Sequence, residues 1–310
     1  MCTLKVLLVA LWCLSVSVKS YAVYSGSCGE SVNWSLDTQT GLLEITGSGE
    51  MEDNPWKSHK SSIIKCTIEN GVTSIRFCAF DGCTWLTSIT IPESVTSIGD
   101  HAFYGCTGLT NITIPESVTS IGSSAFDGCT GLTSITWNAI SCTSFSSRTF
   151  DGIKENITSF TFGVKVQTIP AELCSGMSNL TNITIPESVT SIGTSAFANN
   201  SNLVSVTCYS QTSPEAVLTG NSRRRTFYGI SKEAILYYPK GSDYSAWAPY
   251  FAQMIEMDET DIDTPKADDG KDTTYGIYDM SGRTVRKAAT TTDGLKAGLY
   301  IINGRKVLVE

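Results

Sequence analysis

Histidine is scarce in this sequence of 310 residues, which contains only His59 and His101. No Cys-x-x-Cys pair is present, so the usual ligand spacing of a zinc site is missing. The sequence also lacks Gly-x-Ser-x-Gly, a phosphate-binding loop and a dinucleotide fingerprint. We therefore expect no catalytic residues, no cofactor and no metal site, and we predict that the protein is not an enzyme.

Basic residues are also few. The sequence has 22 Lys and Arg against 30 Asp and Glu, a formal net charge of −8, and its one basic cluster lies at residues 223–225. Nucleic acids and anionic lipids attract positively charged surfaces. The charge balance therefore argues against a nucleic-acid partner, and we interpret the basic cluster as a solvated turn.

Long apolar runs are missing except at the N-terminus, where residues 6–18 are apolar apart from two serines. This run follows Lys5 and precedes a Ser-Tyr-Ala sequence, which is the layout of a secretory signal peptide over residues 1–22. Lipid attachment at Cys13 is disfavoured because a tryptophan precedes it where a small residue is expected. A membrane span needs about 20 apolar residues, so we expect none in the mature chain.

A phrase of 23 residues recurs along the rest of the chain. From Leu109 it reads Leu-Thr-Asn-Ile-Thr-Ile-Pro-Glu-Ser-Val-Thr-Ser-Ile-Gly, followed by Ala-Phe at 125–126 and Gly-Cys at 128–129. Overlapping copies begin at Leu86, Leu109, Leu132, Leu180 and Leu203. Self-similarity at a fixed period of this length predicts a repeat solenoid, in which successive copies stack as coils.

Each copy opens with the spacing apolar-x-x-apolar-x-apolar, which predicts a short strand whose first, fourth and sixth residues face the core. The predicted inward triads are Ile63/Cys66/Ile68, Leu86/Ile89/Ile91, Leu109/Ile112/Ile114, Leu132/Ile135/Trp137, Ile157/Phe160/Phe162, Leu180/Ile183/Ile185 and Leu203/Val206/Cys208. An eighth strand is predicted at Leu236. Between Trp137 and Phe162 the spacing is 25 residues, and we interpret residues 138–156 as a bulged coil and not as a break.

The remainder of each copy predicts two further sides of the coil. A proline such as Pro115 lacks an N–H group, so it ends the strand and forces the chain around a corner. Val118 and Ile121 then form a second inward-facing side. The Ala-Phe pair, as at 125–126, fits a short helical turn whose ring fills the space between coils.

Nine of the eleven cysteines lie outside the predicted signal peptide, and an odd number cannot all pair within one chain. Cys83, Cys106 and Cys129 recur at 23-residue spacing, each after a glycine. Equivalent side chains on neighbouring coils lie about 4.8 Å apart, which is one strand spacing. We favour a ladder of small buried thiols over disulfide bonds.

The ends of the solenoid differ from its repeats. Residues 23–56 contain a strand-turn-strand pattern, which predicts an N-terminal β-hairpin cap. Residues 57–257 hold the repeats and an aromatic-rich C-terminal cap with a short helix at 244–250. Residues 258–274 are acidic, with almost nothing apolar, and predict a linker. Residues 275–310 contain three short strand patterns at 277–283, 298–302 and 306–309, and predict a small all-β unit.

The phrase Ile-Thr-Ile-Pro-Glu-Ser-Val-Thr-Ser-Ile-Gly, with Ala-Phe and Gly-Cys, resembles the BspA-type leucine-rich repeats of bacterial surface proteins. The resemblance covers roughly residues 28–257. It implies a β-rich leucine-rich-repeat solenoid of 23-residue coils with short parallel strands and short helical or 3-10 turns. It also implies an adhesin, which binds host matrix or plasma proteins or other cells.

The C-terminal segment has a resemblance of its own. Residues 276–283, 298–302 and 304–307 are similar to the C-terminal sorting domains read by the type IX (Por) secretion system, although this copy is shorter than such domains usually are. The resemblance implies a secretion machinery as partner and passage across the outer membrane. We therefore expect a secreted, extracellular or outer-membrane-surface protein.

Strand alternation places the residues between the inward triad members on the outside of the coil. The candidate partner-binding face comprises Thr87, Ser88, Thr90, Thr110, Asn111, Thr113, Thr133, Ser134, Thr136, Thr158, Ser159, Thr161, Thr181, Asn182 and Thr184. These side chains are either simply well-solvated strand residues or a docking surface for a protein or glycan ligand on host or neighbouring cells. A structural or glycan-binding surface component is the alternative to an adhesin. Specificity could also lie in the irregular stretches at 138–156 and 209–232.

Overall fold

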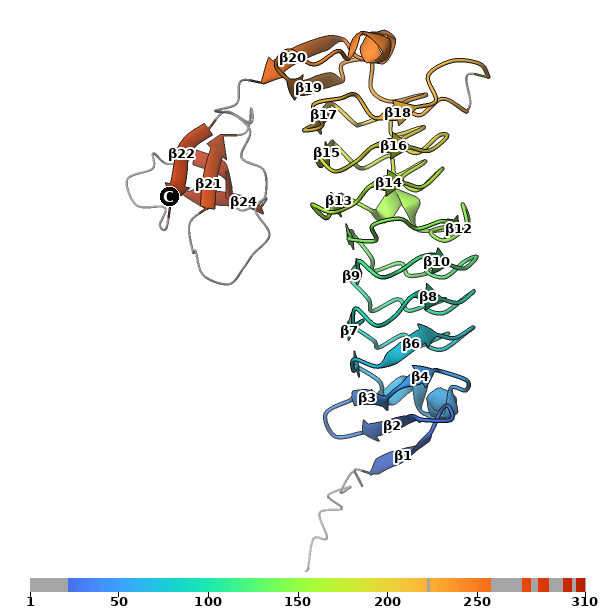
Figure 1. Ribbon diagram of the computed structural model, residues 1–310. Coiled ribbons are helices and arrows are strands. Elements are labelled where there is room, and N and C mark those ends of the chain that lie inside the picture. The colour runs from blue at the N-terminus through green and yellow to red at the C-terminus, as the bar shows by residue number, and fades with distance from the viewer. Residues whose placement is uncertain are drawn as a thin grey trace, which may run out of the picture.

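A stack of coils that climb in one direction forms most of the protein (Figure 1). The computed structural model describes residues 22–221 and 224–257, together with four strands between residues 275 and 309. The predicted signal peptide, apart from its last residue, and the predicted acidic linker at 258–274 lie outside the described residues. Between these limits the structure is a β-solenoid of about 23 residues per coil, as the period predicts.

One side of the coil is a column of short parallel strands in register. Ile112 pairs with Ile135 and Ile135 with Phe160, so residues at the same place of the repeat stand beside each other. The predicted eighth strand is present and pairs in parallel with the seventh. The strands of this first face are β5 (Lys65–Ile68), β7 (Ser88–Thr90), β9 (Asn111–Ile114), β11 (Ser134–Trp137), β13 (Ser159–Phe162), β15 (Asn182–Ile185), β17 (Ser205–Cys208) and β19 (Ile235–Pro239).

The second side consists of two-residue to four-residue strands that follow the corner. Val118 and Ile121 are both buried there, as the sequence predicts. The strands of this second face are β4 (Gly49–Glu50), β6 (Val72–Ile75), β8 (Ser97–Ile98), β10 (Ser120–Ile121), β12 (Ser144–Phe145), β14 (Thr168–Ile169), β16 (Ser191–Ile192) and β18 (Glu215–Ala216).

The third side carries the Ala-Phe pairs, which lie in short turns as the sequence predicts. The segment is a series of turns in which His101 and Ser124 adopt the left-handed backbone conformation, with φ of 54° and 53°. The N–H of Phe103 donates to the carbonyl of Ala125 on the next coil at 2.8 Å. These hydrogen bonds between coils alternate with bonds back along the chain, such as that from Tyr104 N–H to the His101 carbonyl at 3.1 Å. The segment therefore forms single turns and no continuous helix.

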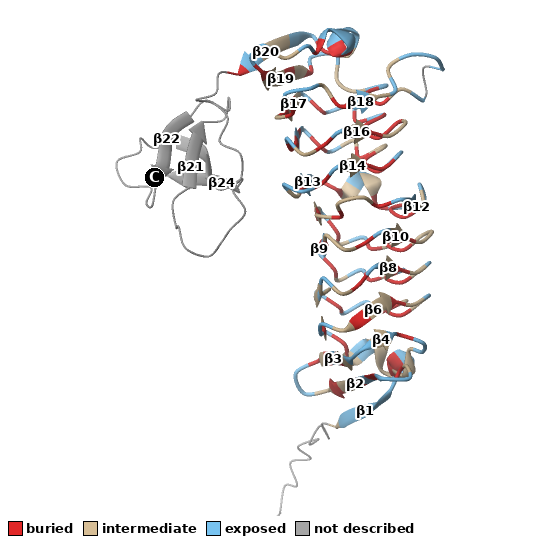
Figure 2. Ribbon diagram, in the orientation of Figure 1, coloured by how far each residue is buried: buried red, intermediate tan, exposed pale blue. Residues whose placement is uncertain are grey.

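The core lies inside the coils and runs the length of the stack (Figure 2). Every predicted triad member is buried except Ile89 and Ile91, which are half-buried and pack against the core. The predicted thiol ladder is also present, since all nine cysteines from Cys28 to Cys208 are free and eight of them are buried. Cys106 Sγ donates to the Phe80 carbonyl at 3.1 Å, and Cys129 Sγ donates to the Phe103 carbonyl at 3.0 Å.

The two ends of the stack are closed by different devices. At the N-terminal end β1 (Val23–Ser27), β2 (Val32–Asp37) and β3 (Leu42–Gly47) form an antiparallel sheet, and β3 then pairs in parallel with β5. The hairpin is as predicted, and β1 is an additional strand. A 3-10 helix, η1 (Pro55–Ser62), places the buried Trp56, whose indole N–H donates to the Ala79 carbonyl at 2.8 Å.

At the C-terminal end, the 3-10 helix η4 (Ser245–Tyr250) covers the last coil, and β20 (Gln253–Met257) adds a parallel strand beside β19. Trp247 is buried, and so is Tyr244, whose hydroxyl donates to the Ser210 carbonyl at 2.8 Å. Among the described residues, no helix has the length and apolar character that a membrane crossing requires.

The last strands form a separate antiparallel sheet in the order β22-β21-β23-β24. Its members are β21 (Tyr275–Asp279), β22 (Thr284–Ala289), β23 (Gly298–Ile302) and β24 (Arg305–Val309). The small all-β unit is therefore present, with β22 as a strand that the sequence patterns did not predict.

Candidate interaction surfaces

The first face presents the predicted columns of polar side chains outward. None of the fifteen candidate residues is buried; twelve are exposed, and Ser88, Ser134 and Thr136 are half-buried. The register aligns Asn111 with Ser134, and Thr113 with Thr136. Strand pairing therefore aligns the side chains of β9, β11 and β13 in columns, which the sequence period alone could only suggest. Among the described strands, β7 does not pair with β9, nor β13 with β15.

The outward side chains form three columns, which begin at Thr87, Ser88 and Thr90. The first and the third column differ in their hydrogen bonding. In the first column the hydroxyl of Thr87 donates to the Ile64 carbonyl at 3.0 Å, and the hydroxyls of Thr133 and Thr158 donate to the coil below at 3.4 Å. These donors are already used to tie coils together. In the column of Thr90, Thr113, Thr136, Thr161 and Thr184, no side-chain hydrogen bond occurs within the described residues.

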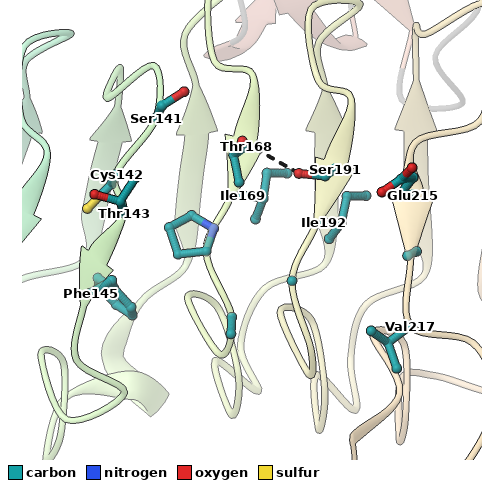
Figure 3. A pocket seen from close by; sticks show the side chains of 14 residues that line it. Ser141, Cys142, Thr143, Phe145, Thr168, Ile169, Ser191, Ile192, Glu215 and Val217 are labelled. Carbon is teal, nitrogen blue, oxygen red and sulfur yellow. Dashed lines mark hydrogen bonds between the residues drawn. The ribbon is translucent and has the colours of Figure 1, made fainter.

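The second face carries a cavity of about 580 Å³. Its lining comes from four neighbouring strands, β12, β14, β16 and β18, and from the residues beside them (Figure 3). Ile169, Ile192 and Ala216 supply apolar surface, whereas Glu215 is its charged residue. The cavity thus joins the two irregular stretches of the sequence, 138–156 and 209–232.

The cavity lies where the strand ladder of the second face is interrupted. In regular coils a glycine donates to the coil below, as Gly122 N–H does to the Ile98 carbonyl at 2.8 Å. The equivalent residue after β14 is Pro170, which has no N–H to donate. β12 and β14 consequently belong to different sheets. The bulged coil is therefore continuous on the first face and broken on the second.

The extra residues of the bulged coil lie beside this interruption. The N–H groups of Gln167 and Thr168 donate to the Ile140 carbonyl at 2.9 and 3.3 Å. In the next coil the equivalent N–H groups, those of Thr190 and Ser191, donate to the Gln167 carbonyl at 2.9 and 3.4 Å. Gln167 stands three places later in the repeat than Ile140 does. Among the described residues, no backbone N–H of the next coil donates to residues 141–143, although Thr143 N–H still donates to the Thr119 carbonyl at 3.0 Å. Ser141, Cys142 and Thr143 form one wall of the cavity.

The chemistry of the thiols is suppressed by their surroundings. Burial raises the pKa of the Cys83 thiol to about 12, and burial together with the nearby Asp53 raises the pKa of Cys28 to about 11. Thiolates are the nucleophilic and metal-binding form of cysteine. In the described part of the chain, no three His, Cys, Asp or Glu side chains are grouped so as to hold a metal ion.

Exposed aromatic rings occur on the third side. This side consists of turns, so strand alternation does not predict which of its side chains point outward. Phe77 is 55% exposed, Trp85 64% and Tyr104 42%. His101 is half-buried, with its ring 5.9 Å from that of Phe77 and 5.6 Å from that of Tyr104. Comparison of neighbouring coils could have found Phe77 and Tyr104, because Asp100 and Ser123 stand at the place of Phe77, and Asp81 and Asp127 at the place of Tyr104.

Several solved structures are similar to this chain. A leucine-rich repeat protein from Eubacterium ventriosum is 18% identical, with a TM-score of 0.37 over 76% of this chain and 85% of that chain. A T. pallidum leucine-rich repeat protein is 22% identical, with a TM-score of 0.32 over 73% and 79%. A leucine-rich cell surface protein from Faecalibacterium prausnitzii is 21% identical, with a TM-score of 0.27 over 64% and 65%. No curated protein sequence matches the chain.

The family comparison is more direct. The model described as "BspA type Leucine rich repeat region (6 copies)" matches residues 52–173 and 98–216, which together are more than half of the chain. These ranges contain the strands β5 to β17 of the first face and the cavity of the second. The chain belongs to the BspA-type leucine-rich repeat family.

Proposed function

We propose that this protein is a surface-displayed adhesin whose first face binds host matrix proteins, plasma proteins or other cells. Leucine-rich repeat proteins are generally protein-interaction modules and in bacteria are associated with the cell surface, and their solenoid fold is typically not enzymatic. The adhesive role and the class of ligand go beyond these general properties of leucine-rich repeat proteins and are our proposal.

The first face supports the proposal through its regularity. Five coils carry the candidate residues in outward columns, and at about 4.8 Å per strand these span about 19 Å. The hydroxyls of Thr90, Thr113 and Thr136 have no side-chain partner among the described residues and can bond to a ligand. Each such hydrogen bond contributes about 1 kcal/mol net. Useful affinity therefore requires many contacts at once, or several copies on one cell.

Binding of the purified protein to a panel of matrix proteins, plasma proteins and glycans tests this proposal. A variant with Thr90→Lys, Thr113→Lys and Thr136→Lys places three bulky charges on the first face and should lose binding. The matched control changes Thr96, Thr119 and Thr190 to lysine, because these are exposed threonines on the second face. Equal binding by both variants would remove the first face from consideration.

A structural or glycan-binding role is the second candidate. The observation that favours it is the repetition itself, because identical hydroxyls recur at one strand spacing, for example Thr113, Thr136 and Thr161. A repetitive carbohydrate lattice could meet such columns in register. In the panel above, binding to glycans alone, abolished by the first-face lysines, would select this candidate.

Export is proposed to proceed in two steps. The signal peptide at 1–22 would direct the chain out of the cytoplasm, and residues 275–310 would be read by a type IX secretion machinery. Deletion of 275–310, followed by cell fractionation, tests the second step. Loss of the protein from the cell surface is expected, and unchanged surface exposure would contradict the sorting role.

A further inference from the structure

Three aromatic side chains on two neighbouring coils form a cluster on the third side, away from both sheet faces. His101 lies between Phe77 and Tyr104, with ring centroids 5.9 and 5.6 Å away. Phe77 and Tyr104 keep about half of their surface in solvent, at 55% and 42%. We call Phe77, His101 and Tyr104 the aromatic cluster.

The scaffold does not require these rings. Backbone pairing fixes the equivalent positions, since Cys78 N–H donates to the Asp100 carbonyl and Gly82 N–H to the Tyr104 carbonyl, at 3.1 and 2.7 Å. By this register Asp100 and Ser123 stand at the place of Phe77, and Asp81 and Asp127 at the place of Tyr104. The same backbone conformation thus forms with polar residues in adjacent coils. The exposed rings are therefore not needed for the stability of the coil.

Carboxylates without a cationic partner border the aromatic cluster. Tyr104 stands between Asp81 and Asp127 on the coils below and above. Asp81 is paired with Lys60 at 2.9 Å. Neither Asp127 nor Asp100, the residue before His101, forms a salt bridge within the described residues.

The basic side chain next to Phe77 in the sequence is also engaged. Arg76 precedes Phe77 and pairs with Asp53 at 3.3 Å. One carboxylate oxygen of Asp100 accepts a hydrogen bond from the Ser123 N–H at 2.6 Å, and the other accepts none from the described residues. The exposed rings and the carboxylates of Asp100 and Asp127, which form no salt bridge within the described residues, are groups that attract a cation.

We propose that the aromatic cluster is a docking site for an arginine or lysine side chain of a partner protein. A guanidinium or ammonium group is attracted to an aromatic face, and arginine also stacks on it with its planar group. Asp100 and Asp127 supply the charge that complements the cation. This site is independent of the first face and would act beside the surface assigned under the proposed function.

Fluorescence polarisation with the full mature chain and a fluorescein-labelled hexa-arginine peptide tests the proposal, with hexa-lysine and hexa-glutamate for comparison. The double variant Phe77→Ser and Tyr104→Ser should weaken hexa-arginine binding by about ten-fold, roughly three-fold for each ring. These substitutions use a residue that Ser123 and Ser175 already provide at the equivalent positions, so the coil should fold. The control is Val204→Ser with Tyr228→Ser, which removes exposed apolar surface elsewhere.

A second double variant, Asp100→Asn with Asp127→Asn, keeps the rings and removes the charge. It should also weaken binding, and binding by the unchanged protein should fall as salt is added. If loss of the rings leaves affinity unchanged, the peptide is held by the general acidity of the protein and the proposal is wrong. If a glycan array shows ligands that depend on the rings but not on the two aspartates, the site is for carbohydrate and the proposal is equally overturned.

Discussion

The rings of Phe103 and Phe126 lie 5.1 Å apart, and their planes differ by 4°. Phe80 continues the stack below, 5.2 Å from Phe103 and again within 4°. All three side chains are fully buried. A 23-residue period that keeps the backbone in register also superposes the side chains, so the repeat builds an interior column of rings as well as an exterior column of hydroxyls.

Replacement of Phe103 by alanine should be among the most damaging single changes. The cavity left between Phe80 and Phe126 cannot collapse, because the backbone on either side is hydrogen-bonded in register. We expect a loss of about 3–5 kcal/mol in the free energy of unfolding, measured by urea denaturation. The neighbouring Tyr104→Ser is the control, since an exposed side chain should cost less than about 1 kcal/mol. Similar losses in both would contradict a core made of stacked rings.

Gly122 is expected to be intolerant of even a methyl group. A Cβ atom there would lie 2.4 Å from the backbone nitrogen of Asp100 and 2.7 Å from its Cα on the coil below. The coils would have to separate, and overpacking of this kind costs about 1–3 kcal/mol. Thermal or urea unfolding of Gly122→Ala against Ser123→Ala makes the comparison. A Gly122→Ala protein as stable as the serine variant would show that the coils are not held as closely as described.

Thiol reactivity should separate one cysteine from the other eight of the mature chain. Cys78 is half-exposed, whereas the others are buried and two of them, Cys106 and Cys129, donate to backbone carbonyls. When the native protein is treated with a thiol reagent near pH 8, about one thiol per chain should therefore react quickly, and the others should react only in denaturant. Cys78→Ser should abolish the fast phase. A fast phase that persists in this variant would mean that a buried thiol is accessible.

Alkaline pH should destabilise the folded chain. Burial raises the pKa of Cys83 from 9.0 to about 12, and that of Cys142 to about 11. A raised pKa in the folded state means that the unfolded chain releases protons first, so stability is complete below about pH 9 and is lost as pH rises toward 11 or 12. Urea midpoints at pH 8 and at pH 10.5 measure the effect. Cys83→Ala should reduce the difference, and a midpoint that rises with pH would contradict the assignment.

The first face could be predicted nearly completely because its signal is local. In a strand the side-chain period is two residues, so the pattern around Ile112 and Ile114 already separates inward from outward positions. Proline at 115 marks the corner for an equally local reason. The candidate columns followed from the same alternation, and their binding role remains a proposal.

The third side could be predicted only in part. Ala125 and Phe126 predict a short turn on their own, but only the next coil decides that Phe126 N–H donates to the Thr149 carbonyl while Asp127 N–H donates back to Ser124. The exposed rings of Phe77 and Tyr104 were missed for a related reason, because aromatic residues in a repeat are expected in the core. Their exposure depends on which residues of each turn point into the core and which point to solvent.

By itself the sequence determined the period, the inward triads and the positions of the corners, because each depends on residues within one copy. Tertiary structure alone decided the hydrogen-bond partners between coils, the broken ladder at Pro170 with its cavity, and the meeting of Phe77, His101 and Tyr104. Each of these features depends on residues of neighbouring coils, which are about one repeat apart in the sequence. A solenoid repeats along the chain, but its surfaces combine residues from neighbouring coils.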